Sequence, residues 1–343
     1  MINIAVLVTG IGGGSHGEQI LKSLKLTNDL NLFIVGTDIT ENTVGKRYVD
    51  SFYIVPLVSD SSYLSSIEEI INKHGIKFVF HGSEPELKFI SENRGWFLRR
   101  GIYHSLNSVN IIRQCMNKFE TYKILEEKGF NLPLFEKIDV VSDVDKISFF
   151  PIVLKPSTGS GGSSYVFVAL NVAEAKLLVE FMLLKKIDII AQQYIGTKDD
   201  EYTVGVSSDG DGNVLGSVVV KRVINNALTT YSSVTDKGEQ YAISSGISQG
   251  YVCKHPKLQK QAEEIAKRLD SRGPLNIQCR WLDGELRLFE INPRLSGTTS
   301  LRSMAGYNEP ILMIRHYLLN EPWKVDYHEM LILRSIEEIE IDE

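Results

Sequence analysis

Residues 286–294 read Leu-Arg-Leu-Phe-Glu-Ile-Asn-Pro-Arg, and this stretch decides how the rest of the chain is interpreted. The apolar residues before Pro293 predict a strand, and because successive side chains of a strand point to opposite faces, Glu290 and Asn292 share one face. A carboxylate and an amide oxygen on one face suit a hard cation such as Mg²⁺, which prefers oxygen ligands. Polar groups on an otherwise apolar strand are costly unless they are coordinated, so a metal site is favoured over chance polar residues.

Gln278, on the preceding predicted strand, is the third candidate ligand, and the turn near residues 282–284 decides whether it shares the face of Glu290. A two-residue turn pairs Gln278 with Phe289 and points its side chain away from that face. A three-residue loop, with its glycine in the left-handed region, pairs Gln278 with Leu288 on that face. We therefore predict the three-residue loop.

A second informative stretch is residues 155–164, Lys-Pro-Ser-Thr-Gly-Ser-Gly-Gly-Ser-Ser, between predicted strands at 151–154 and 165–170. No helix follows it, so it is not a Walker loop. A Gly/Ser hairpin offers free amides for a polyphosphate, and Lys155 adds a point charge; a flexible hairpin without function is the alternative. Glycine and serine bury little apolar area, so we expect this loop to be mobile without nucleotide and to close on it.

A competing glycine loop lies at residues 12–17, Gly-Gly-Gly-Ser-His-Gly, after the predicted strand 2–9. It fits G-x-G-x-x-G, and Asp38 follows Gly17 by 21 residues. This motif alone does not distinguish between two alternatives. The loop either binds a dinucleotide or is a βα turn that holds none.

The order of the predicted elements divides the chain into a part with alternating strands and helices and a part with successive strands. Strands and helices alternate at first, which predicts a mainly parallel sheet, with strands at 2–9, 32–37 and 78–81 and helices at 17–25 and 63–74. Asn117 and Glu120 form a capping box for a helix ending near Gly129, and Asn171 and Glu174 repeat the pattern. From residue 202, strands with short turns predict an antiparallel sheet, at 202–206, 214–220, 275–281 and 286–292, with a helix at 256–270.

The composition excludes several classes of protein. The chain has 343 residues, of which 43% are hydrophobic and 23% charged, so it is neither disordered nor fibrous and is long enough for several domains. The formal net charge of −6 argues against non-specific DNA binding. We find no membrane-spanning run and no signal peptide. Cys115, Cys253 and Cys279 form neither a disulfide framework nor a zinc site, which predicts a reduced, cytoplasmic location.

Lys118, the Lys155 hairpin and the Glu290–Arg294 stretch, in this order, resemble the ATP-grasp superfamily over nearly the whole chain. The greatest resemblance is to the synthetase units of the carbamoyl phosphate synthase large subunit and to stand-alone carboxylate–amine ligases. It implies an α/β fold, with α+β character in the C-terminal part. The implied parts are a Rossmann-like pre-ATP-grasp domain (1–112), a small lobe (113–190) and a large lobe (191–325) of the ATP-grasp fold, and a tail (326–343).

The resemblance also implies roles for individual residues. ATP would contact the two lysines, the glycine loop, the hinge at the adenine and an acidic residue at the ribose: Lys118, Lys155, Gly159, Ser160, Gly161, Gly162, Ser163, Gln193, Tyr194, Ile195 and Glu201. Gln278, Glu290 and Asn292 would hold metal. The catalytic residues would be Lys155, Arg294 at the γ-phosphate and the substrate carboxylate, and, by a looser match, Arg222.

The activity implied is that of an ATP-dependent ligase. It would phosphorylate a carboxylate to an acyl phosphate and join it to an amine, releasing ADP and phosphate. It would use ATP with two Mg²⁺ ions, Mn²⁺ being the alternative ion. The partners would be small-molecule carboxylate and amine substrates, without nucleic acid or membrane, and a homodimer is left open. The alternatives are a carbamoyl-phosphate-synthase-like subunit that phosphorylates carboxy or carbamate groups, an NAD-dependent dehydrogenase, and a non-catalytic nucleotide-binding module.

The chain departs from the family pattern at several places. Asn117 replaces the usual aspartate, Gln193 replaces the usual glutamate, and residues 225–250 have no readable match. The chain also contains a single synthetase unit. Within this family, residues 12–17 would be a structural turn or would line the acceptor site without NAD. Three polar residues near predicted strand ends would face the substrate or lie in ordinary polar turns: His16, Glu84 and Glu86.

Overall fold

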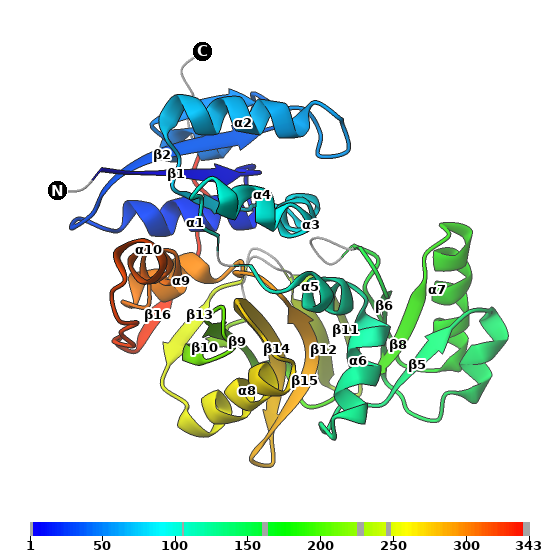
Figure 1. Cartoon of the computed structure of the whole chain (residues 1–343). Coiled ribbons are helices and arrows are strands. Elements are labelled where there is room, and N and C mark those ends of the chain that lie inside the picture. Colours follow the sequence, from blue (N-terminus) through cyan, green and yellow to red (C-terminus); the bar gives the residue numbers. More distant parts are fainter. Residues whose placement is uncertain (1–2, 105, 160–163, 225–229, 245–247, 339–343) are drawn as a thin grey trace.

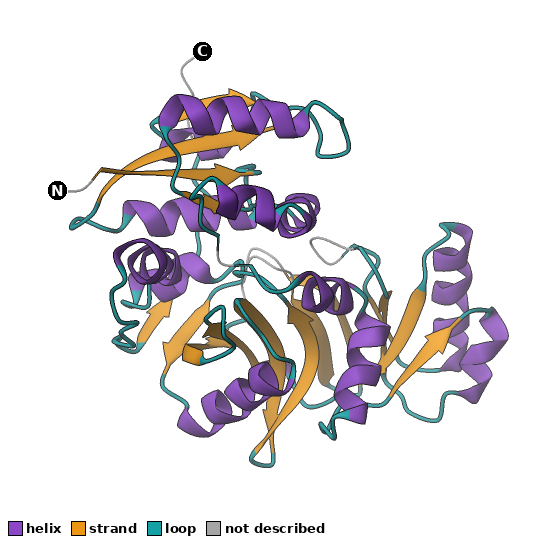
Figure 2. Cartoon of the chain, viewed as in Figure 1, coloured by secondary structure: helices purple, strands orange, loops and turns teal. Residues whose placement is uncertain are grey.

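The computed structural model describes residues 3–104, 106–159, 164–224, 230–244 and 248–338. The N-terminal unit, with β1, β2 and α1 to α4, lies above the rest of the chain, which we call the larger unit (Figure 1). The larger unit extends to the right of this view, where β5 and α7 lie. Helices and strands alternate in the N-terminal unit, whereas strands dominate the centre of the larger one (Figure 2). Among the helices that the structure describes, none is long and apolar enough to cross a membrane.

The N-terminal sheet has the order β3-β2-β1-β4, and its strand pairs are parallel, as predicted. Its elements are β1 (Asn3–Thr9), α1 (His16–Lys25), β2 (Asn31–Asp38), η1 (Val44–Tyr48), β3 (Ser51–Ile54), α2 (Tyr63–His74), β4 (Phe78–Phe80), α3 (Glu84–Glu92) and α4 (Arg94–Arg99). Leu7 packs in the core on the α2 side, whereas Val6 and Val8 pack in the core on the α1 side. Burial on both faces explains why β1 is a continuous apolar run.

The next part of the chain forms an antiparallel sheet of order β5-β8-β6-β7. Its elements and the helices before it are α5 (Val109–Met116), α6 (Lys118–Glu127), β5 (Phe135–Ile138), η2 (Val141–Lys146), β6 (Ile152–Pro156), β7 (Phe167–Ala169), α7 (Val172–Leu184) and β8 (Ile189–Gln193). Both predicted caps are present: Asn117 Oδ1 accepts the amide of Glu120 at 3.2 Å, and Asn171 Oδ1 accepts that of Glu174 at 3.0 Å.

The large sheet has the order β15-β14-β9-β10-β13-β16 and is antiparallel, as predicted. Its elements and neighbours are η4 (Lys198–Asp200), β9 (Glu201–Ser208), β10 (Val214–Arg222), β13 (Gly250–Cys253), α8 (Pro256–Arg268), β14 (Pro274–Leu282), β15 (Glu285–Asn292), α9 (Thr299–Met304), α10 (Glu309–Leu319) and β16 (Met330–Ile332). Residues 225–250, where we predicted no element, also contain a hairpin of β11 (Thr230–Asp236) and β12 (Glu239–Ser244).

Candidate active site

The turn between β14 and β15 differs from the prediction. Asp283 and Gly284 form a two-residue turn, because Leu282 pairs directly with Glu285. Both turn residues have left-handed φ angles, 54° and 81°, as a type I′ turn requires, and Asp-Gly is a preferred sequence for that turn. The three-residue loop that we predicted is therefore wrong.

A β-bulge at Phe289 nevertheless brings Gln278 to the predicted face. Cys279 pairs with Leu288, but the next pair joins Gln278 to Glu290, so Phe289 is an extra residue on its strand. The extra residue shifts the alternation by one position. Leu288 therefore lies in the apolar core while Glu290 lies opposite Gln278.

The bulge also supplies a partner for Lys155, whose side chain is buried. The Lys155 ammonium donates to the Phe289 carbonyl at 2.9 Å, to Gln192 Oε1 at 2.8 Å and to the Tyr122 hydroxyl at 3.1 Å. Tyr122 in turn donates to the Phe289 carbonyl and accepts from Gln192 Nε2 at 2.8 Å. The three partners of the ammonium are neutral, so its charge is balanced by dipoles and by more distant groups.

Glu290 and the two lysines influence each other through charge. Burial lowers the pKa of Lys155 to about 7, Glu290 opposes that shift, and Lys118 adds to it. Burial alone would raise the pKa of Glu290, but Lys118, Lys155, the hydrogen bond from Asn292 and the charge of Arg294 together lower it below its usual value. The backbone places Lys118 close by, since its amide donates to the Ser157 carbonyl at 2.8 Å, just beyond β6. A half-buried carboxylate that two lysines help to keep ionised is an arrangement suited to phosphate and metal chemistry.

The three predicted metal ligands lie together. Gln278 is opposite Glu290, and Asn292 Nδ2 donates to Glu290 Oε1 at 3.1 Å. Gln278 Oε1 accepts from Arg222 at 3.4 Å. Within the described part of the chain, no group of three or more His, Cys, Asp or Glu side chains is placed to hold a metal. This donor set of one carboxylate and two amide oxygens fits a hard cation that takes further oxygens from phosphate.

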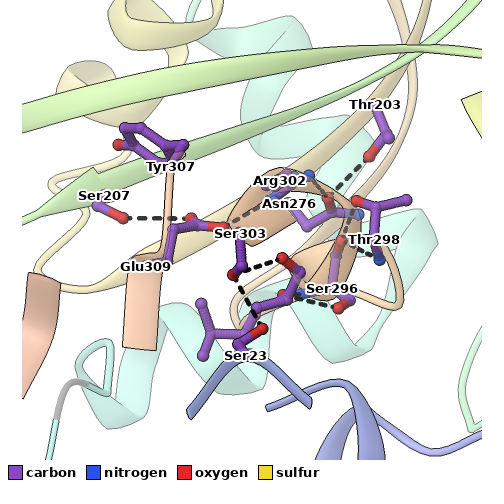
Figure 3. Close-up of polar contacts among 12 residues, drawn as sticks. Ser23, Thr203, Ser207, Asn276, Ser296, Thr298, Arg302, Ser303, Tyr307 and Glu309 are labelled. Carbon is purple, nitrogen blue, oxygen red and sulfur yellow. Dashed lines mark hydrogen bonds and ion pairs between the residues drawn. The ribbon is translucent and has the colours of Figure 1, made fainter. Parts of the chain in front are cut away.

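Farther along the same face of β14 lies a group of buried polar side chains (Figure 3). Asn276, which pairs with Asn292 across the strands, accepts from Thr203 at 2.7 Å and from Arg302 at 2.8 Å. Arg302 also forms a fully buried ion pair with Glu309 at 3.0 Å. These contacts link β9, β14, α9 and α10, and so hold the strand face that carries the ligands.

Glu201, predicted to meet the ribose, lies in a buried cluster with two arginines. Its carboxylate is 3.0 Å from Arg222 and 3.7 Å from Arg280. Arg280 continues from this cluster to the predicted hinge, where it donates to the carbonyl of Ile195 and covers the Tyr194 ring at 4.2 Å. The cluster therefore fixes the hinge relative to the large sheet.

The hinge also holds the β11–β12 hairpin. The Tyr194 hydroxyl bonds to both the amide and the carbonyl of Ala242 on β12, each at 3.1 Å. Gln193 takes the place of the family's glutamate. Its backbone amide donates to the Leu134 carbonyl at 2.8 Å. Residues 230–244, for which we had no interpretation, thus pack against Tyr194, one of the residues predicted to contact the adenine.

Of the five loop residues predicted to contact ATP, only Gly159 lies in the described part of the chain. Gly159 has a left-handed φ of 54°. Ser160, Gly161, Gly162 and Ser163 lie outside the described residues, as does the loop closure that we predicted.

In the competing glycine loop, a carboxylate of the chain itself takes the backbone amide. Glu18 Oε2 accepts from the Gly14 amide at 2.6 Å, and Ser15 caps α1 by accepting from the Glu18 amide at 3.3 Å. Asp38 is buried and accepts from the amide of Ile39 at 2.8 Å. A carboxylate at the start of α1 takes the place that a pyrophosphate would need, which favours the structural-turn interpretation.

The three polar residues at the strand ends have different surroundings. Glu86 turns inward and accepts from Ser83 at 2.9 Å and Tyr63 at 3.3 Å, so it belongs to a satisfied polar turn. Burial and the charge of Arg294 lower the pKa of His16. The charge of Glu84 opposes the lowering of the Arg294 pKa by burial.

Sequence analysis missed several residues of this region. Tyr122, Gln192, Arg280 and His81 were not assigned roles. Arg280 was detectable, because it stands two residues after Gln278 and therefore on the same face of an otherwise apolar strand. Tyr122 lies on the buried face of a helix, where an aromatic residue normally indicates only core, so its hydroxyl gave no such indication.

Two family models match the chain. Residues 188–339 match a family described as "ATP-grasp in the biosynthetic pathway with Ter operon". Residues 6–104 match the "PylC-like, N-terminal domain".

The chain is also similar to curated proteins. An uncharacterized protein of Methanocaldococcus jannaschii is 27% identical over 67% of this chain and 54% of its own length. The carbamoyl phosphate synthase large chain of Methanosphaerula palustris is 23% identical over 85% of this chain and 27% of its own length. The chain thus spans about half of the first relative and about a quarter of the second.

Solved structures share the fold. An L-amino acid ligase from Bacillus licheniformis superposes with a TM-score of 0.62 at 18% identity, over 93% of this chain and 75% of that one. The site geometry, the two family models and this likeness of fold agree with the predicted resemblance. The family models thus assign residues 188–339 to an ATP-grasp family and residues 6–104 to a PylC-like N-terminal domain, and the chain as a whole is similar to ATP-grasp proteins.

Proposed function

We propose that the chain is an ATP-dependent ligase that joins a carboxylate to an amine and releases ADP and phosphate. The observation that carries this proposal is the placement of Glu290 beside Lys155 and Lys118, with Gln278 and Asn292 on the same face. The arrangement offers cations for a polyphosphate and oxygen ligands for the metal that accompanies it. Matches to ATP-grasp family models and to carbamoyl phosphate synthase large chains support it.

In this proposal ATP binds between the two lobes. Lys118 and Lys155 bind its phosphates, the hinge at Tyr194 and Ile195 meets the adenine, and Glu201 meets the ribose. The side chains that would hold Mg²⁺ are Gln278, Glu290 and Asn292. When bound, Mg²⁺ neutralises phosphate charge and polarises the phosphorus–oxygen bonds.

The reaction has two displacement steps. A substrate carboxylate oxygen attacks the γ-phosphorus, the bond from that phosphorus to the β–γ bridging oxygen breaks, and ADP leaves with that electron pair. The amine nitrogen then attacks the acyl carbon of the acyl phosphate, loses a proton, and phosphate leaves. Positioning and charge neutralisation, which Lys155 and Arg294 provide, matter more here than acid–base groups. Arg222, hydrogen-bonded to Gln278, would support the same charges.

The proposal is tested by ligand binding and by product formation. ATP with Mg²⁺ should raise the melting temperature, since a ligand at a hundred times its Kd adds about 2.7 kcal/mol. A screen of paired amino acids and metabolites should find a pair that makes ADP release depend on both. Stabilisation by NADH, and not by ATP, would instead support the dehydrogenase alternative and overturn the proposal.

A further inference from the structure

Groups from four elements meet at one buried point beside the predicted phosphate site. Tyr122 lies on α6, Lys155 on β6 and Gln192 on β8. Val153 pairs with Gln192 across β6 and β8, so Lys155, two residues further along β6, is a diagonal neighbour of Gln192 on the same face. The fourth group is the carbonyl of Phe289, the extra residue of the bulge in β15. This cluster therefore joins the β5-β8-β6-β7 sheet to the strand that carries two of the predicted metal ligands.

The Lys155 ammonium uses all of its protons within this cluster. It donates to Gln192 Oε1 at 2.8 Å, to the Phe289 carbonyl at 2.9 Å and to the Tyr122 hydroxyl at 3.1 Å. An ammonium has three N–H donors, so these three bonds use them all. Lys155 is also only 5% exposed. A phosphate oxygen can therefore bond to this ammonium only when one of the three bonds is given up.

Gln192 is the partner that the ammonium has to keep. Gln192 is 2% exposed, and Lys155 is the donor to its Oε1 among the described residues. Its Nε2 is used as well, since it donates to the Tyr122 hydroxyl at 2.8 Å. If Lys155 moved away, a buried carbonyl oxygen would be left without a donor, and such unpaired groups are costly and rare. Gln192 therefore fixes where the ammonium stays.

The bond to Tyr122 is the one that can be exchanged at the lowest cost. The Tyr122 hydroxyl also accepts from Gln192 Nε2 and donates to the Phe289 carbonyl, so it stays paired when the ammonium leaves it. The Phe289 carbonyl would likewise keep the hydroxyl as a donor, but its bond to the ammonium is the shorter one, at 2.9 Å against 3.1 Å. A phosphate oxygen is anionic, and it forms a stronger bond to an ammonium than a neutral hydroxyl does. Exchange of Tyr122 for a phosphate oxygen is therefore favourable.

We infer that Gln192 and Tyr122 are positioning residues for Lys155, with different parts in the binding of a nucleotide. Gln192 keeps its bond to the ammonium throughout. Tyr122 accepts the third N–H of the ammonium in the free protein, and a phosphate oxygen of the nucleotide takes the place of its hydroxyl. The inference rests on the proposed function, in which Lys155 binds the phosphates of ATP. It adds to that function two positioning residues and the exchange of one hydrogen bond.

The test compares a ligand that has phosphates with one that has none, and it needs no turnover. Calorimetry measures the Kd of a non-hydrolysable ATP analogue with Mg²⁺ and the Kd of adenosine. Gln192→Met should weaken binding of the analogue roughly tenfold, because a charged donor loses its fixed partner, and should leave binding of adenosine unchanged. Tyr122→Phe should lower the melting temperature, because Gln192 Nε2 loses its acceptor. It should nevertheless bind the analogue at least as tightly as wild type, since no bond to Tyr122 has to be broken.

A purely structural role would instead weaken binding of the analogue in both variants. The inference is overturned if Tyr122→Phe weakens binding of the analogue as much as Gln192→Met does. It is also overturned if Gln192→Met leaves the ratio of the two Kd values at its wild-type value.

A double variant keeps the test decisive if Gln192→Met alone fails to fold. Gln192→Met combined with Tyr122→Phe removes two groups that bond to each other, so fewer buried groups are left unpaired. This double variant should bind the analogue roughly tenfold more weakly than Tyr122→Phe alone, for the same reason as the single change. Equal binding by the two would overturn the inference.

Matched controls make the same substitutions elsewhere in the larger unit. Gln259→Met removes a donor to the Ser217 carbonyl at 3.1 Å, and Tyr307→Phe removes a hydroxyl that accepts from Trp323 at 3.3 Å. Both controls should keep the wild-type ratio of the two Kd values.

Lys155→Met and a separate assay of ADP release distinguish this inference from the proposed function. If Lys155→Met weakens binding of the analogue and Gln192→Met does not, the inference fails while the phosphate contact of the proposed function stands. If the Gln192 and Tyr122 variants behave as expected but no acceptor pair gives ADP release, the inference stands and the ligase is contradicted.

Discussion

At the residue scale, Glu290 is the carboxylate on which both the lysines and the metal ligands depend. Glu290→Gln keeps the size of the side chain and removes its negative charge. The fold should persist, while the site loses the negative charge that offsets the positive charges of Lys118 and Lys155. We expect ADP release to fall at least about a hundredfold, since lost electrostatic stabilisation acts on the transition state. Initial rates and circular dichroism check this. Glu285→Gln, at the exposed start of the same strand, should be near normal. Near-normal turnover of Glu290→Gln at saturating Mg²⁺ would contradict the metal assignment.

His81 makes stability depend on pH. Its pKa is about 3 in the folded protein, against an ordinary value of 6.5. The unfolded chain therefore binds a proton on His81 below pH 6.5 that the folded protein does not, and stability is lost as the pH falls from 6.5 toward 3. The His81→Asn variant has no imidazole at this position, so this loss of stability at low pH should be absent. The stability gap between wild type and variant should shift by about 2 kcal/mol in favour of the variant between pH 7.5 and pH 5. Melting curves at both pH values check this, and a constant gap would contradict it.

At the element scale, one hydroxyl of the hinge contributes to holding the β11–β12 hairpin. Tyr194→Phe leaves the amide and carbonyl of Ala242 without that partner, at a cost of about 1–3 kcal/mol. We expect faster amide exchange in β12 and a several-fold higher KM for ATP, because the hairpin stands beside the hinge. Tyr241→Phe is the control, since its hydroxyl bonds, within the described part of the chain, to the exposed Glu239. Equal exchange in both variants would show that the hairpin is held by other contacts.

At the scale of the whole molecule, Arg334 connects the two units. It donates to Gln19 of α1 at 2.9 Å, to the Ser248 carbonyl at 2.9 Å and to the Gly297 carbonyl at 2.6 Å. Arg334→Met should loosen α1 against α9, raise the KM for the acceptor several-fold and leave ATP binding nearly unchanged. The reason is that, in the proposed function, ATP binds between the two ATP-grasp lobes, whereas the loop at residues 12–17, which would line the acceptor site, precedes α1.

Kinetics with both substrates and amide exchange of α1 check the Arg334 prediction. Arg113→Met, which removes a largely exposed arginine with a surface partner, is the control. A larger effect on ATP than on the acceptor would mean that Arg334 does not act through the junction of the units.

Local patterns in the sequence predict most of the elements. Apolar alternation and the Asn117 and Asn171 caps depend on neighbours within a few residues, and the structure confirms the corresponding strands and helices. The bulge at Phe289 could not be predicted, because it depends on how the apolar Leu288 and Ile291 both reach the core beneath the sheet. The hairpin at residues 230–244 lacks strong apolar alternation, and it forms against the hinge at Tyr194.

By itself the sequence determined the kind of chemistry: a lysine before a glycine loop, and a carboxylate with two amides on neighbouring strands. These groups are close in the chain or in register, so local geometry orders them. Only the tertiary structure decided which groups surround them. The Lys155 ammonium bonds to the Phe289 carbonyl across 134 residues of chain, and the charge of Arg294 adds to the lowering of the pKa of His81 by burial. Such contacts form only when packing of distant apolar faces outweighs the entropy of closing long loops, and no short pattern contains that balance.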